Sequence, residues 1–241
     1  MRDRWCERRQ GLQSPEAIVP LVLGLLSPKR IVDLGCGDGA WLAAFAKHGV
    51  QDFLGIDVQK KALRIPEDKF LARDLRKPLQ LQTKFDLAIC LEVAEHLPPG
   101  CAEFLVESLV RLAPVILFSA AIPYQQGFGH LNLQWPDYWE KHFQAKGFVA
   151  VDALRRKIWQ NHDLSWWYRQ NMFLLVDRTQ LEHYPPLRGE STGVISLVHP
   201  ENYLAVAASA ARTDPQHISL RRHLSLLPFV AFNSVRRRMA R

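Results

Sequence analysis

The stretch IVDLGCGDG, residues 31–39, decides the fold of this chain. It reads as an apolar strand that ends in Asp33 and then breaks into three alternating glycines, Gly35, Gly37 and Gly39, before a helical run begins. A chain that leaves a buried parallel strand must reverse direction at once, and residues without a Cβ allow this beside a ligand. The stretch therefore predicts a strand, a ligand-binding turn and a helix in succession.

A carboxylate follows at the spacing that a nucleotide-type site requires. The apolar run FLGIDV closes on Asp57, about 20 residues past the glycine loop, where a carboxylate accepts both hydroxyls of a ribose. Gly35, Gly37 and Ala40 also satisfy the looser dinucleotide pattern, so the loop by itself leaves that cofactor class open. The loop lacks the Lys or Arg expected to hold a second phosphate-bearing nucleotide, which argues against NAD(P).

Apolar runs and helical stretches alternate along most of the chain. Strands are expected at residues 30–33, 53–57, 69–72, 86–91 and 115–119, followed by late strands within 148–154 and 171–178, and helices at 15–26, 40–48, 100–112 and 136–146. Such alternation is typical of an α/β fold with a doubly wound, parallel sheet. The first helix is expected to begin with Ser14 as its N-cap and Pro15 at its first position.

The D-x-G-x-G-x-G arrangement that starts at Asp33, together with FDLAICLE and the VAEHLPPG that follows it, resembles class I S-adenosylmethionine-dependent methyltransferases of the small-molecule type. The similarity covers roughly Ile31 to Arg178. It implies a Rossmann-like, mostly parallel seven-stranded sheet with an antiparallel last strand. It also implies S-adenosyl-L-methionine as the cofactor and methyl transfer as the activity.

The resemblance assigns cofactor contacts to matching positions of this sequence. Asp33 and the backbone of the glycine loop would take the methionine end, Asp57 the ribose, and Asp74 with Leu75 the adenine ring. Glu92 would face the cofactor. The expected cofactor-binding residues are Asp33, Gly35, Cys36, Gly37, Gly39, Asp57, Asp74, Leu75 and Glu92.

Glu92, Glu95 and His96 form an E-x-x-E-H cluster, which lies on one face if the turn is helical. The family that methylates the 3′-terminal ribose of small RNAs carries a similar cluster with a downstream histidine as metal ligands. Here His130 is the candidate fourth ligand of a divalent metal. Metal-free relatives share the same motif, so both interpretations stay open.

His130 is the first choice for a general base, with Glu95 and His96 as further catalytic candidates, because imidazole titrates near neutrality. Polar and aromatic neighbours surround it in the loop after the fifth strand, namely Tyr124, Gln125, Gln126, Asn132, Gln134 and Trp135. A lining of this kind suits a hydroxyl-rich acceptor. We expect a small-molecule acceptor, such as the hydroxyl of a sugar or glycosylated metabolite.

Composition limits the partners. The chain has 241 residues, 48% of them hydrophobic, and a net charge of +7 that is concentrated at its ends, in Arg2, Arg4, Arg8 and Arg9 and in Arg236, Arg237, Arg238 and Arg241. Because this excess is not interleaved with aromatics around the proposed site, nucleic acid is not the expected partner. An RNA ribose 2′-O-methyltransferase is the alternative enzyme, and an inactive cofactor-binding scaffold or regulatory subunit is the alternative of another class.

Three segments are expected: an N-terminal helical segment 1–28, a methyltransferase domain 29–178 and a C-terminal extension 179–241. The four cysteines form no CxxC pair, which favours reduced thiols in the cytoplasm. No apolar stretch is long enough for a stable membrane insertion. The last stretch, residues 218–241, reads as an amphipathic basic helix that docks on the core or makes an oligomer contact.

Overall fold

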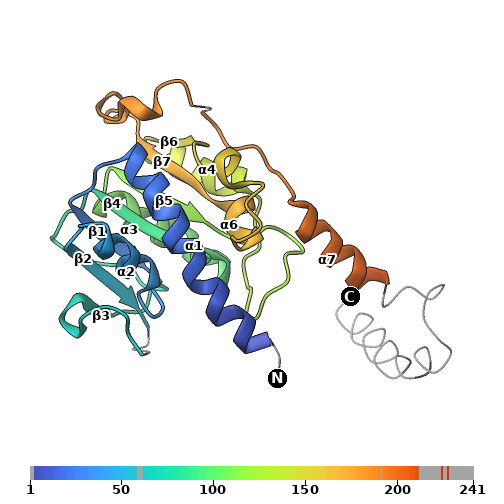
Figure 1. Ribbon diagram of the computed structural model, residues 1–241. Coiled ribbons are helices and arrows are strands. Elements are labelled where there is room, and N and C mark those ends of the chain that lie inside the picture. Colours follow the sequence, from blue (N-terminus) through green and yellow to red (C-terminus); the bar gives the residue numbers. More distant parts are fainter. Residues whose placement is uncertain (1–2, 59–61, 191, 212–223, 225–226, 228–241) are drawn as a thin grey trace. The chain divides into compact units, whose positions relative to one another are not determined.

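The computed structural model describes residues 3–58, 62–190, 192–211, 224 and 227, with side chains from Gln13 onward (Figure 1). The strands are β1 Arg30–Leu34, β2 Asp52–Asp57, β3 Phe70–Ala72, β4 Leu87–Leu91, β5 Val115–Ser119, β6 Phe148–Val151 and β7 Phe173–Asp177. The α-helices are α1 Asp3–Leu25, α2 Ala40–Lys47, α3 Ala102–Leu112, α4 Pro136–Gln144, α5 Arg155–Ile158, α6 Trp166–Asn171 and α7 Pro200–Ala211. The 3₁₀ turns are η1 Glu67–Lys69, η2 Ala94–His96, η3 Pro99–Cys101, η4 Leu181–His183 and η5 Pro185–Leu187.

The strands form one seven-stranded sheet in the order β3-β2-β1-β4-β5-β7-β6. Pairings from β3 through β5 are parallel, whereas β7 runs antiparallel to both of its neighbours, β5 and β6. Strand order reverses between β1 and β4, which is where doubly wound sheets bind their ligands. The predicted Rossmann-like sheet with an antiparallel last strand is confirmed.

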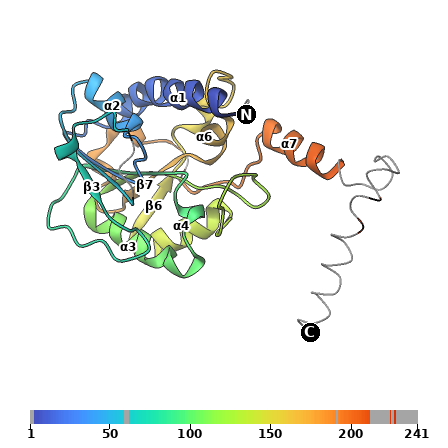
Figure 2. The same cartoon turned by 90° about the horizontal axis from the view of Figure 1, so that it is seen from below.

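Helices cover both faces of this sheet (Figure 2). The helices α1 and α2 lie on one face with the α5–α6 segment, and α3 and α4 lie on the other. Each face has its own apolar cluster because alternate side chains of a strand point to opposite sides. The central strands β4 and β5 are buried along their whole length, as a parallel sheet covered on both faces requires.

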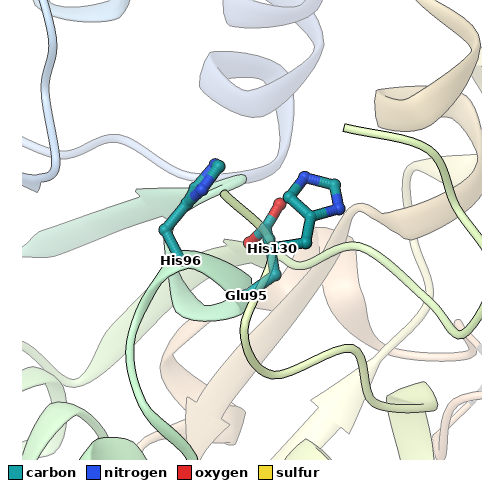
Figure 3. A group of neighbouring side chains, drawn as sticks. All are labelled: Glu95, His96 and His130. Atoms are coloured by element: carbon teal, nitrogen blue, oxygen red, sulfur yellow. The ribbon is translucent and has the colours of Figure 1, made fainter. Parts of the chain in front are cut away.

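The loops that follow β4 and β5 meet at the carboxyl edge of the sheet. The main-chain carbonyl of Glu95, in η2, accepts hydrogen bonds from the amides of Leu131 and Asn132 at 2.7 and 3.0 Å. These bonds dock the long loop after β5 onto the short turn after β4, and they bring His96 and His130 to the same place (Figure 3). The segment that carries the E-x-x-E-H motif and the loop that carries His130 are thus neighbours in space.

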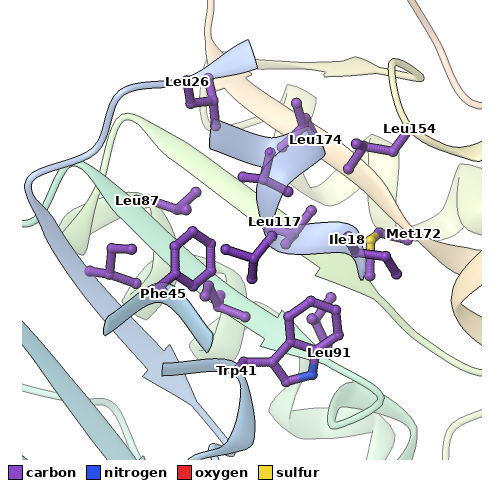
Figure 4. Packing of buried hydrophobic residues seen from close by; sticks show 14 of the residues in the cluster. Ile18, Leu26, Trp41, Phe45, Leu87, Leu91, Leu117, Leu154, Met172 and Leu174 are labelled. Carbon is purple, nitrogen blue, oxygen red and sulfur yellow. The ribbon is translucent and has the colours of Figure 1, made fainter. Parts of the chain in front are cut away.

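The first helix differs from the sequence-based expectation. It starts at Asp3 instead of Pro15, and both Pro15 and Pro20 lie inside it. Ser14 is buried, and its Oγ accepts the amide of Ser165 at 3.1 Å instead of capping the helix. Ser14 and Pro15 therefore do not start the helix. It continues through them because it buries Ile18 and other apolar residues against the sheet and α2 (Figure 4). This burial outweighs the loss of the helical hydrogen bonds that proline cannot donate.

The chain divides after His199 and not after residue 178, since the compact units are 1–199 and 200–241. Residues beyond β7 stay with the sheet: the amide of Gly193 donates to Ala150 O at 2.9 Å, and Arg155 Nη1 donates to Ile195 O at 2.8 Å. The predicted N-terminal segment 1–28 also belongs to this unit. The second unit contains α7, and its expected C-terminal basic helix lies outside the described residues, as do Arg236 and its basic neighbours.

Among the described helices, none is both long and apolar enough to cross a membrane.

Candidate functional site

The glycine loop follows β1 and takes backbone conformations that favour glycine. Gly35, Gly37 and Gly39 have φ of 83°, 59° and 82°. A Cβ on Gly35 would lie 2.3 Å from a methyl carbon of Val93, and one on Gly39 would lie 2.9 Å from Ile65, whereas a Cβ on Gly37 would meet nothing within 4 Å. Gly35 and Gly39 are therefore required for packing, and Gly37 is the position where the backbone is open to a ligand.

The amides of this loop are already used within the protein. Gly35 and Cys36 donate to Ile56 O at 2.7 and 3.1 Å, and Gly39 donates to Cys36 O at 2.8 Å. The amide of Gly37 donates to Asp57 Oδ2 at 2.9 Å. The loop backbone was expected to bind the methionine end of the cofactor. Because these amides already donate within the protein, the loop favours a ligand mainly by allowing it to approach the backbone closely.

Asp57, at the end of β2, fixes the loop and also faces the cavity described below. Its Oδ2 accepts the Gly37 amide, and its Oδ1 accepts the Val58 amide at 2.7 Å. These two main-chain donors orient the carboxylate. This arrangement fits the predicted ribose contact.

Asp33, in β1, is 2% exposed, and its Oδ2 has no hydrogen-bond partner among the described residues. Burial raises the pKa of Asp33 to about 8, and the negative charge of Asp57 adds to the increase. A buried carboxylate oxygen without a partner needs a cation or a donor from a ligand. The α-ammonium group of S-adenosylmethionine is such a cation, so this residue fits the predicted cofactor.

A cavity of about 600 Å³ opens at this edge of the sheet. The residues around it come from the loops after β1, β2, β3 and β4. They are Gly35, Gly37, Asp57, Val58, Asp74, Leu75, Arg76, Glu92, Val93, His96 and Leu97. Most of the predicted cofactor contacts therefore line one cavity.

Three predicted contacts are absent from this lining: the buried Asp33 described above, Cys36 and Gly39. The Cys36 thiol is buried and lies against Gly55, where an added Cβ would be 2.8 Å from its sulfur. Gly39 packs against Ile65 and leads into α2. The expectation that Cys36 and Gly39 touch the cofactor is not supported by where the structure places them.

Asp74 lines the cavity with its carboxylate already paired. Arg76 Nε donates to both carboxylate oxygens at 2.9 and 3.1 Å, and Arg76 Nη2 donates to Oδ2 at 2.8 Å. These bonds lower the pKa of Asp74 to about 2. The group is ionised at neutral pH and retains acceptor capacity, so its predicted bond to an adenine amino group stays a prediction.

Glu95, His96 and His130 form a cluster beside this cavity. One ligand atom from each lies within 4.8 Å of the others, and the Glu95 carboxylate lies between the two imidazoles (Figure 3). His96 Nδ1 donates to Gly129 O and His130 Nδ1 donates to Gln125 O, each at 3.3 Å. Since a carbonyl only accepts, Nδ1 of each ring carries a proton, and Nε2 is the atom that each ring could offer to a ligand.

Both carboxylate oxygens of Glu95 are buried without a hydrogen-bond partner among the described residues. Burial, together with the negative charge of Glu92, raises the pKa of Glu95 to about 9. A carboxylate and two imidazoles whose Nδ1 protons are fixed by carbonyls form a donor set that suits a divalent cation. The residues present thus fit the metal ion that the motif suggested, with Glu92 outside the cluster.

His130 is partly buried, and this burial, aided by the charge of His96, lowers its pKa. The imidazole is therefore neutral at neutral pH, with a lone pair on Nε2. That is the protonation state a general base needs. Gly127 lies directly against the ring, and a Cβ there would come within 2.1 Å of His130 Cε1.

Glu92 belongs to a buried polar network that the sequence did not reveal. Its Oε1 accepts Asn171 Nδ2 at 3.1 Å, and its Oε2 accepts Gln125 Nε2 at 3.2 Å. Gln170 and Asn171, at the end of α6, are each 1% exposed. The signal available in the sequence was the polar run Arg169–Asn171 directly before an apolar strand.

In the loop after β5, some of the side chains expected to line the acceptor site are buried inside the protein and others are exposed. Gln125 and Asn132 are buried, at 5% and 2% exposure, whereas Tyr124 and Phe128 are exposed at 81% and 99%. The amides support the loop from within, and the aromatic rings are the groups available to an acceptor. In α6, the ring of Tyr168 packs edge-on against Trp41, with 5.2 Å between the ring centroids.

Curated proteins with similar sequences include proteins named O-methyltransferases. The chain is 32% identical over 108 residues to the ubiquinone biosynthesis O-methyltransferase of Alkalilimnicola ehrlichii, covering 40% of this chain and 43% of that protein. It is 29% identical over 134 residues to the protein of the same name from Bordetella avium, covering 48% and 55%. The chain thus spans about half the length of the curated relatives it matches.

Solved structures show the same fold at low sequence identity. DesVI of Streptomyces venezuelae has a TM-score of 0.53 and 16% identity, with 71% of this chain and 94% of that chain covered. Magnesium protoporphyrin IX methyltransferase of Synechocystis PCC 6803, solved with bound S-adenosylmethionine, has a TM-score of 0.50 and 21% identity, with 72% and 81% covered. A family model described as a methyltransferase domain matches residues 7–177. The chain therefore belongs to the methyltransferase-domain family, as the sequence predicted.

Proposed function

We propose that this chain transfers the methyl group of S-adenosylmethionine to a hydroxyl of a small polar acceptor, in particular a sugar or a sugar-bearing metabolite. The observation that carries the proposal is the placement of a neutral imidazole, His130, next to His96, which itself lines the cofactor cavity. The ring centroids of the two histidines are 5.0 Å apart.

The chemistry is an in-line displacement at the sulfonium methyl group. The acceptor oxygen forms the new bond to carbon as the bond from carbon to sulfur breaks, and S-adenosylhomocysteine leaves. The hydroxyl proton passes to His130 Nε2, and the resulting imidazolium is held by the Gln125 carbonyl at Nδ1. Asp33, Asp57 and the open face of Gly37 hold the cofactor so that its methyl group stays in position for attack.

Two observations support oxygen and a sugar-like group as the acceptor. The relatives in two bacteria are named O-methyltransferases. Tyr124, Phe128 and the half-exposed Trp135 present aromatic faces on the loop that carries His130, and such faces stack on the C–H surfaces of sugar rings. We place this reaction in the cytoplasm, where thiols such as Cys36 and Cys90 stay reduced.

As an alternative to the role of His130 as base, we propose that Glu95, His96 and His130 bind a divalent cation that takes part in acceptor binding. The Nε2 lone pair of His130 would then be held by the metal ion, and His130 would not take the hydroxyl proton. The cluster supports this through its unpartnered carboxylate and two available Nε2 atoms. Such an ion, when bound, polarises an acceptor hydroxyl. A ribose 2′-hydroxyl of RNA is the acceptor that this cluster favours as a second candidate, by resemblance to the small-RNA methylating family. The third candidate, an inactive scaffold, would not require a neutral histidine at this place.

The decisive experiment is transfer of labelled methyl from S-adenosylmethionine into a cell extract. Label in small polar metabolites supports the main proposal, and mass spectrometry then identifies the acceptor. Label that is lost on ribonuclease digestion replaces it with the RNA function. No incorporation by a folded protein that binds S-adenosylhomocysteine supports the scaffold.

A further inference from the structure

Gln125 is a buried residue that contacts both parts of the candidate site. Its Nε2 donates to Glu92 Oε2 at 3.2 Å, at the wall of the cofactor cavity. Its main-chain carbonyl accepts His130 Nδ1 at 3.3 Å. One residue thus joins a carboxylate of the cofactor cavity to the proposed base.

The orientation of the Gln125 amide is determined by its surroundings. Its Oε1 accepts Asn171 Nδ2 at 3.0 Å, Gln170 Nε2 at 3.2 Å and the Ile122 amide at 3.3 Å. Because three donors converge on Oε1, the donor end of the amide, Nε2, is the end that faces Glu92. A flipped amide would oppose three donors with its own N–H groups and would place its oxygen against the carboxylate.

Backbone strain is concentrated at the hydrogen bond between Gln125 and Glu92. Among the described residues, two that are not glycine have positive φ: Glu92 at 54° and Tyr124 at 67°. Glu92 is one partner of the bond, and Tyr124 directly precedes the other. A left-handed L-residue costs about 1–2 kcal/mol, and such strain persists where the surroundings fix the conformation for a functional reason.

We propose that Gln125 is a positioning residue that fixes His130 relative to the cofactor cavity, by tying its loop to Glu92 and to Asn171. Asn171 lies at the end of α6, directly before β7, so the loop is anchored to the sheet. The inference rests on the proposed function for the role of His130. The placement of the imidazole is measurable without turnover.

The test compares three variants by the reactivity of His130 toward diethyl pyrocarbonate, which acylates neutral imidazole. Gln125→Glu keeps the shape and removes the donor to Glu92. The exchange variant, Glu92→Gln with Gln125→Glu, restores a donor and an acceptor with their roles reversed. Gln126→Glu makes the same change at the exposed neighbour. Modification is followed by peptide mass spectrometry, with the exposed His183 as the internal reference.

We expect Gln125→Glu to raise the rate at His130 by about fivefold or more, which is the factor that loss of one hydrogen bond of ordinary strength gives. The exchange variant returns the rate toward that of the unaltered protein, and Gln126→Glu leaves it unchanged. An unchanged rate in Gln125→Glu overturns the proposal, as does a folded exchange variant that stays as reactive as Gln125→Glu. If Gln125→Glu does not fold, the exchange variant alone decides, because its hydrogen bonds are complete.

Methyl transfer is a separate readout. With the acceptor fraction of the extract as substrate, kcat is expected to fall in Gln125→Glu. The exchange variant is compared by His130 reactivity alone, because Glu92 lines the cofactor cavity. If His130 reactivity follows the expected pattern while turnover does not, Gln125 positions His130 as proposed and His130 is not the base. The failure of the proposed function is thereby distinguished from the failure of this inference.

Discussion

The imidazole of His130 lies directly on the backbone of Gly127: a Cβ on Gly127 would be 2.2 Å from Nε2 of the ring. No side chain fits there while His130 keeps its place. We therefore expect Gly127→Ala to displace the ring and to reduce turnover by about 10²-fold, the scale of a misplaced catalytic group. Affinity for S-adenosylhomocysteine, measured by calorimetry, should stay the same.

A matched control for this change is Gly24→Ala, because a Cβ on Gly24 would meet nothing within 4 Å and the residue lies in α1. Turnover should be unaffected. If Gly127→Ala is as active as Gly24→Ala, the described position of His130 is wrong.

Substitutions at His130 and at Asp57 should have separate effects, the first on catalysis and the second on cofactor binding. His130→Ala removes the proposed base and should abolish methyl transfer with little change in cofactor affinity. Asp57→Asn retains an acceptor for Gly37 or Val58 but loses the charge and one acceptor position, so it should weaken cofactor binding by about tenfold or more. Normal turnover by His130→Ala would show that another group takes the proton.

The raised pKa of Asp33 leads us to expect that cofactor binding releases a proton from this carboxyl group. Burial raises its pKa to about 8 in the folded protein without ligand, above the usual 3.8, so the carboxyl is protonated at pH 6.5. The ammonium group of the cofactor favours the charged form. Binding at pH 6.5 should therefore release about one proton, and affinity should rise with pH up to the folded pKa. Calorimetry in two buffers of different ionisation enthalpy measures the release, which Asp33→Asn should eliminate.

The same shift has a consequence for folding. The folded chain holds this proton between about pH 4 and pH 8 while the unfolded chain does not, so the contribution of Asp33 to stability falls as pH rises through that window. Thermal unfolding of Asp33→Asn should lack this part of the pH dependence. An identical pH profile in both proteins would contradict the raised pKa.

The glycines of the loop should respond differently to alanine. Gly35→Ala forces a Cβ against Val93 and should destabilise the whole domain. Gly37→Ala has space for its methyl group, which projects into the cofactor cavity, and its left-handed φ costs about 1–2 kcal/mol. We expect a folded Gly37→Ala protein that binds S-adenosylhomocysteine poorly. Thermal unfolding and calorimetry together distinguish the two effects.

The proposed cation predicts that a chelator lowers turnover and that Mg²⁺ or Zn²⁺ restores it. Glu95→Gln should remove that response, because it replaces the buried carboxylate of the cluster with a neutral amide. Chelator-treated protein that retains full turnover would mean that the cluster acts without metal. The matched control is Glu107→Gln on α3, which makes the same change at a carboxylate outside the cluster. Among the described contacts, Glu107 accepts a hydrogen bond from the exposed Arg111, so this variant should keep the response to the chelator.

The glycine loop was predictable from sequence because its parts are local. The positive φ of Gly37 and the carboxylates at the ends of β1 and β2 depend on a few neighbouring residues and on the rule that parallel strands end at one edge. The first helix shows the limit of local signals. Ser14 and Pro15 read as a helix start, yet burial of Ile18 and its neighbours carries the helix through them.

The acceptor side depended on contacts between distant segments. Gln125 read as a possible acceptor contact, and only the fold shows that it faces inward, where Asn171, 46 residues away, donates to it. Glu92 and Asn171 are separated by 79 residues, and no spacing rule links them. The sequence by itself determined the sheet and the glycine loop, because these follow from backbone freedom and strand order. Tertiary structure decided which side chains of the long loop turn inward, since that depends on docking against η2 and α6.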